Sequence, residues 1–164
     1  MKGIGLVCTG LFAGFLTAVL VLEVSLRRFD GTVYTQVRLV ELADLDKLAV
    51  VTLLPALAAT GVLVLLRRRA ATRWPVVVAF LLLALVMGLT VVVNLPINAE
   101  QVGWNAGSPP AGWAEVRDRW QLAHTVRTLA AVVAFVLLAL GRPGQPVNAQ
   151  GPRRPHATNT ASPR

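Results

Sequence analysis

Four long apolar runs, separated by more polar segments, dominate the sequence. They cover residues 4–22, 48–66, 75–93 and 122–140. A run of 19 residues would form an α-helix about 28 Å long at ~1.5 Å per residue. Such a helix just spans a hydrocarbon core of about 30 Å. The pattern therefore predicts an all-α fold, an integral membrane four-helix bundle.

The polar segments indicate how these helices are joined. From residue 33 to 47 apolar and charged residues alternate, which predicts a helical extension of the second run or a helix at the membrane interface. Asp30 or Thr32 could cap its start. Pro96 is expected to end the third helix, because proline disfavours helix in the preceding residue. Residues 102–112 are rich in Gly and Pro, so we expect a loop there and a restart near Trp113.

Two features of the first run indicate whether it is cleaved as a signal peptide and how it packs. It is longer than the ~7–15 apolar residues of a signal peptide, and no small-x-small site follows it, so we interpret it as a retained helix. Gly10 and Gly14 have the spacing that allows close approach of another helix. Packing within the chain is favoured over a dimer face.

Composition supports one membrane domain with a polar tail. The chain is 55% hydrophobic and 15% charged, whereas soluble domains carry about 25% charged residues. We predict a four-transmembrane-helix domain over residues 1–140. Residues 141–164 are rich in Pro, Gly, Asn, Ser, Thr and Arg, which predicts a disordered basic tail.

The net charge of +8 predicts orientation rather than nucleic-acid binding. Basic residues precede the first run, fill the connection at 67–73 and follow the fourth run, whereas the other two connections are balanced by acids. The positive-inside rule then places both termini in the cytoplasm of a multi-pass cell membrane protein. The segment 94–121 would form a short extracytoplasmic cap.

Polar and aromatic residues gather at the extracytoplasmic end of the fourth run. Arg117, Trp120, His124 and Arg127 are spaced by three, four and three, so on a helix they share one face. His124 and Arg127 lie within the apolar run, where charged and polar side chains are expected to face the bundle interior.

The predicted topology brings further polar residues to the same end. Glu23 ends the first helix there, and Asn94 and Asn98 end the third. Glu23 is the preferred partner for Arg127, followed by Asp44 or Asp46.

Two interpretations of this cluster remain open. In the first, the ion pair and Asn94 only hold the helices and loop together, and Trp104, Trp113 and Trp120 form an interfacial aromatic belt. In the second, the cluster is a site, since a belt needs no histidine and histidine titrates near neutral pH. The Cys and His content is too low for a structural zinc site, so no metal is expected.

The motif Asn-x-Pro-x-Asn, followed by Arg-x2-Trp-x3-His-x2-Arg, resembles the anthrone oxygenase-like family of small four-helix membrane proteins. The residues that carry this resemblance are Asn94, Pro96, Asn98, Trp104, Trp113, Arg117, Trp120, His124 and Arg127. It covers about residues 5 to 140.

The resemblance implies a cofactor-independent oxygenase acting with O2 on a lipophilic aromatic molecule such as an anthrone. His124 would be the base, and Arg127 or Arg117 would stabilise an oxyanion. The three Trp residues would form flat apolar walls, and Asn94, Asn98 and Glu23 would complete the substrate-binding set. No cofactor is implied.

The alternative function is non-enzymatic, as an assembly partner or a small-molecule binder in the lipid bilayer. A transporter subunit is less favoured, because polar residues lie at one end of the predicted bundle and form no path across it. An enclosed pocket beside His124 would distinguish a site from a scaffold. The oligomeric state and the substrate stay open at this point.

Overall fold

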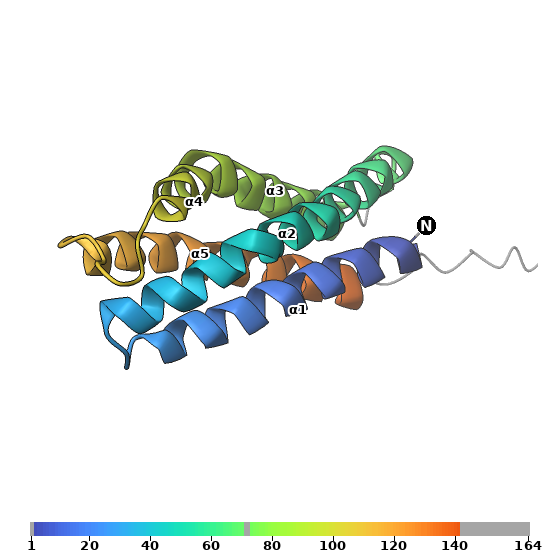
Figure 1. The fold of residues 1–164 in the computed structure, drawn as a ribbon. Helices are drawn as coiled ribbons and strands as arrows, with labels where there is room; N and C mark the ends of the chain where they lie inside the picture. Colours follow the sequence, from blue (N-terminus) through green and yellow to red (C-terminus); the bar gives the residue numbers. More distant parts are fainter. Residues whose placement is uncertain (1, 71–72, 142–164) are drawn as a thin grey trace, which may run out of the picture.

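The computed structural model is a bundle of long helices and describes residues 2–70 and 73–141 (Figure 1). Four segments are long and apolar enough to cross a membrane, which confirms the predicted four-helix membrane protein. The helices are α1 (Lys2–Leu26), α2 (Gly31–Arg67), α3 (Trp74–Leu89), η1 (Thr90–Asn94), α4 (Leu95–Val102) and α5 (Trp113–Leu140). The predicted tail lies outside the described residues from 142 onward.

The helices extend beyond the apolar runs at the end that carries the polar cluster. The helix α2 is continuous over 37 residues, which confirms the helical extension of the second run. Asp30 caps it, because its Oδ1 accepts a hydrogen bond from the Val33 amide at 3.0 Å. In Figure 1 the α1–α2 turn and the α4–α5 loop lie at one end of the bundle, and the start of α1 lies at the other.

The prediction that the third helix ends at Pro96 is wrong. The chain stays helical from Trp74 to Val102, but five residues of π-helix, η1, intervene before Pro96. The Leu95 amide donates to the Thr90 carbonyl, five residues back. This wider turn relieves the clash that a proline ring makes with an α-helical carbonyl, and α4 begins with Pro96 in its first turn. The chain changes direction between α3 and α4 (Figure 1).

The apolar core lies along the middle of the bundle, where α1, α2, α3 and α5 meet. The predicted close approach at Gly10 is confirmed, because an added Cβ would lie 2.9 Å from Cε2 of Phe135 on α5. The same prediction for Gly14 is wrong. Gly14 is exposed and has no heavy atom within 4 Å of an added Cβ. Successive residues four apart drift around the helix, so the second glycine has turned away from α5.

Candidate functional site

A cavity of about 270 Å³ lies inside the bundle at its polar end. Side chains of α1, α2, α3, η1, α4 and α5 line it. One side is apolar and includes Phe15, Leu16, Leu53 and Met87. The polar side consists of Arg38, Glu41, Asp46, Asn94, Asn98, Trp120, His124 and Arg127. The void therefore combines the apolar walls and convergent polar groups typical of small-molecule sites.

His124 is held in one orientation on the cavity wall. Its ring stacks on Trp120, with centroids 4.7 Å apart and planes 12° apart. Its Nε2 lies 3.1 Å from the carbonyl oxygen of Leu16 on α1. A carbonyl only accepts hydrogen bonds, so Nε2 carries the hydrogen. In the neutral ring Nδ1 then carries the free lone pair, and it is buried without a hydrogen-bond partner.

Other cavity-lining groups are also buried without partners. Besides His124 Nδ1, these are Arg127 Nε, Asn94 Oδ1 and Glu41 Oε1. Leaving such an atom unsatisfied costs about 1–3 kcal/mol, and most buried polar atoms in proteins do have partners. Arg127 is a donor and the other three atoms are acceptors. The four residues line the cavity, but these atoms have almost no accessible surface, so a bound molecule would reach them only after the side chains turn.

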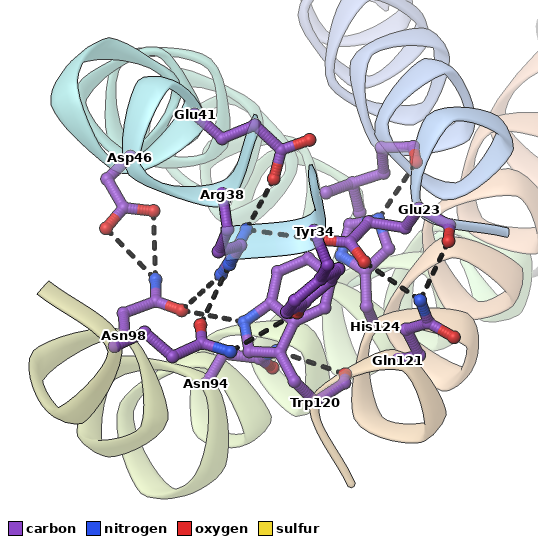
Figure 2. Close-up of polar contacts among 12 residues, drawn as sticks. Glu23, Tyr34, Arg38, Glu41, Asp46, Asn94, Asn98, Trp120, Gln121 and His124 are labelled. Atoms are coloured by element: carbon purple, nitrogen blue, oxygen red, sulfur yellow. Dashed lines mark hydrogen bonds and ion pairs between the residues drawn. The ribbon is translucent and has the colours of Figure 1, made fainter. Parts of the chain in front are cut away.

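Arg38 organises the polar side of the cavity, as Figure 2 shows. Its Nε donates to Oε1 of Gln101 at 2.8 Å. One terminal nitrogen donates to Glu41 at 2.7 Å and the other to Oδ1 of Asn98 at 2.6 Å. The guanidinium also lies 4.0 Å from the centre of the Trp120 ring, in a cation–π contact. One side chain thereby links α2, α4 and α5.

The predicted ion pair between Glu23 and Arg127 is wrong. Glu23 is fully buried and lies 3.4 Å from Arg38, and Gln121 donates to its other carboxylate oxygen at 2.9 Å. Arg38 lies on the buried face of the amphipathic start of α2, and this position brings its guanidinium to Glu23 on α1. Among the described residues, no carboxylate lies within 4.0 Å of Arg127. Asp46 attracts it electrostatically from a longer distance.

Asn98 joins the charged groups to the aromatic wall. Its Oδ1 accepts hydrogen bonds from Arg38 and from Trp120 Nε1, the latter at 2.7 Å. Its amide nitrogen donates to both carboxylate oxygens of Asp46, at 2.9 and 3.0 Å. Asn94, one turn earlier, donates to the Trp120 carbonyl at 3.4 Å. These hydrogen bonds fix the position of the Trp120 ring. Because the His124 ring stacks on Trp120, they also fix the His124 ring beside the cavity.

The family model described as Anthrone oxygenase matches residues 46–137, more than half of the chain. The chain belongs to the anthrone oxygenase family. No curated protein and no solved structure matches it. The part that matches the family contains Asp46, Asn94, Asn98, Trp120, His124 and Arg127, whereas Glu23, Arg38 and Glu41 precede it.

Several residues that the motif of the anthrone oxygenase family suggested as site residues do not line the cavity. Trp113 packs against Tyr34 in a tilted arrangement, with centroids 5.5 Å apart, and the Trp104 ring lies 6.5 Å from the same ring. Arg117 covers Trp113 at 4.9 Å and pairs with Asp118 at 3.0 Å. Together with Glu23, they do not line the cavity. Trp104, Trp113, Tyr34 and Arg117 form an aromatic cap over the polar network.

Sequence reasoning placed Arg38 and Glu41 on an amphipathic helix but did not place them in the site. A signal was present, because Tyr34, Arg38, Glu41 and Leu45 are spaced by four, three and four and so share one face. A face that mixes aromatic, charged and apolar residues at the end of a membrane helix is unusual for a solvated surface. In residues 2–70 and 73–141, no three His, Cys, Asp or Glu side chains are grouped as metal ligands would be.

Proposed function

We propose that this protein is a cofactor-independent oxygenase that acts on a lipophilic aromatic molecule held in the cavity. The observation that carries the proposal is the cavity, whose lining includes His124, Arg127 and Asn94, each with a buried polar atom that has no hydrogen-bond partner. A base, a cationic donor and a neutral acceptor converge there. Family membership supports the choice of reaction.

The reaction begins with proton abstraction from an acidic benzylic carbon. Nδ1 of His124 accepts the proton, while the Nε2–H bond to Leu16 keeps the ring in place. The electrons of the broken C–H bond move onto the ring carbonyl oxygen of the substrate. The Arg127 guanidinium stabilises this oxyanion, which forms in a site largely closed to water.

Oxygen then reacts with the electron-rich carbanion. The carbanion transfers one electron to O2, and the two radicals combine to form a C–O bond. The resulting peroxide anion takes back the proton from His124. Loss of water, as the second C–H bond and the O–O bond break, leaves a new carbonyl. One oxygen atom enters the product and the other leaves as water, so anthrone plus O2 gives anthraquinone plus water.

The remaining lining groups would orient the ligand. Trp120 lines the cavity with a ring that His124 and Arg38 already contact, so a flat ring system would pack against the accessible part of its edge. The apolar side, with Phe15, Leu16, Leu53 and Met87, would receive the rest of the ring system. Asn94 Oδ1 could accept a hydrogen bond from a phenolic hydroxyl of the substrate.

Oxygen uptake tests the proposal directly. Membranes containing the protein are supplied with emodin anthrone, and the rate is corrected for spontaneous autoxidation. Activity should withstand chelators. His124→Ala should abolish the enzymatic rate and leave the thermal transition in place, because the base is lost. Arg127→Lys should also lose most activity, since an ammonium lacks the planar guanidinium fork.

Leu122→Ala is the matched control. Leu122 lies on α5 between Trp120 and His124 but is 69% exposed and does not line the cavity. Its rate should equal that of the wild type. Equal oxygen uptake by wild type and His124→Ala, over a range of lipophilic phenols and anthrones, would exclude the oxygenase. Retained ligand binding in that case would identify a small-molecule binder.

A further inference from the structure

The cavity has an apolar rim on the outside of the bundle. Val50 and Leu54 of α2 line it and are each 49% exposed. Val91 of η1 and Leu95 of α4 line it from the facing side and are 53% and 44% exposed. Side chains that line an internal void and are also exposed mark where the void opens. The opening therefore lies between α2 and the η1–α4 segment.

This rim belongs to the membrane-spanning part of the chain. Val50 and Leu54 follow the start of the apolar run at 48–66, and Val91 precedes the end of the run at 75–93. Both helices are candidate membrane spans. Apolar side chains exposed at this depth contact lipid rather than water. The polar end of the same opening is marked by Asp46, which is half-buried and also lines the cavity.

The opposite side of the cavity, toward the aqueous loops, is closed. Arg38, Glu41 and Asn98 lie there at 3%, 4% and 6% exposure and are tied to one another by the bonds of Arg38. The aromatic cap covers this network from the α1–α2 turn to the start of α5. A molecule coming from water would have to break buried ion pairs, whereas one coming from lipid meets mainly valines and leucines, with Asp46 at the polar end of the opening.

We propose that the cavity is loaded sideways from the bilayer through a portal formed by Val50, Leu54, Val91 and Leu95. The proposal rests on the proposed function and names its substrate class: flat, membrane-dissolved aromatics whose polar edge lies toward the lipid headgroups. Molecules confined to water by permanent charge are excluded. The π-turn contributes to the portal, because Thr90, Val91 and Asn94 of η1 all line the cavity.

Paired substitutions test the portal. Val91→Phe and Leu54→Phe narrow the rim. Val92→Phe and Val51→Phe are the matched controls, because these neighbours are 73% and 66% exposed but do not line the cavity. Binding of anthraquinone to protein in lipid nanodiscs is followed by stopped-flow quenching of tryptophan fluorescence. The rim variants should slow association by about tenfold, since entry must wait for an opening motion, and the controls should match the wild type. Anthraquinone-2,6-disulfonate should not bind.

Equal association rates in rim and control variants would overturn the portal and leave the oxygenase proposal intact. The reverse outcome, slowed entry in rim variants without any oxygen uptake, would keep the portal and reject the oxygenase.

A second measurement needs no ligand. In a variant that keeps only Trp120 (Trp74→Phe, Trp104→Phe and Trp113→Phe), phospholipids brominated on the acyl chain should quench fluorescence, and Val91→Phe should weaken this quenching more than Val92→Phe. Aqueous iodide should not quench. Quenching by iodide with no difference between the two valine variants would place the entrance on the water side.

Discussion

Arg38 is the residue on which the polar network depends. It contacts Glu23, Glu41, Asn98 and Gln101 while only 3% exposed. Removing it leaves two buried carboxylates facing each other. We expect Arg38→Leu to destabilise the protein by about 3–5 kcal/mol, the usual cost of breaking a buried pair. Arg38→Lys should recover part of this, because an ammonium restores the charge but carries its donors on one nitrogen and cannot reach Gln101, Glu41 and Asn98 as the planar guanidinium does.

Thermal unfolding in detergent measures this effect. Arg28→Leu serves as the control, because Arg28 is exposed at the α1–α2 turn. If Arg38→Leu and Arg28→Leu shifted the transition equally, the network would contribute nothing to stability.

One close approach between α1 and α5 depends on a small residue, Gly10. An added Cβ at Gly10 meets the Phe135 ring at 2.9 Å, whereas one at Gly14 meets open space. Gly10→Leu should therefore lower stability by about 1–3 kcal/mol through overpacking. Gly14→Leu should leave the transition in detergent unchanged. A larger loss at Gly14 than at Gly10 would mean that the exposed face of α1 meets a partner that the isolated bundle lacks.

The α3–η1–α4 segment shows how one element shapes the site. A continuous α-helix through Pro96 would lose a hydrogen bond and clash with the preceding turn. The π-turn accommodates the proline and carries Asn94 to the cavity wall, and α4 then presents Asn98 to Arg38 and Trp120. A helix that ended at Pro96 would have left Asn98 in a loop, without a defined direction.

We predict the orientation of the whole molecule in the membrane from its charges. The start of α1, which begins at Lys2, and the end of α2, which ends at Arg67, lie at the end of the bundle opposite to the α1–α2 turn and the α4–α5 loop (Figure 1). The positive-inside rule predicts that this basic end faces the cytoplasm. In a Cys8→Ala background, Ser108→Cys should react with a membrane-impermeant maleimide in intact cells. Arg68→Cys should react only after lysis. Labelling of both positions from outside would contradict the arrangement with both termini in the cytoplasm.

The helices could be predicted from the sequence because lipid leaves the backbone no alternative. A long apolar run inside a membrane must satisfy its own hydrogen bonds, so it becomes a helix whatever its neighbours are. The amphipathic start of α2 and the restart at Trp113 were also readable from local pattern and capping residues. Helical spacing brought Trp120, His124 and Arg127 into the candidate set, and the predicted topology then added Asn94 and Asn98 at the same end of the bundle.

The pairing of the polar groups depends on contacts between helices. No local sequence pattern encodes such contacts. Arg38 reaches Asn98 across 60 positions and Gln101 across 63. Its distance from Glu23 depends on how α1 and α2 rotate against each other, so Arg38 rather than Arg127 became the partner. The cavity, its unpartnered atoms and its lipid-facing rim exist only where six segments converge. Helix propensity is a property of neighbouring residues along the chain. The enclosed cavity depends instead on how whole helices are rotated against one another.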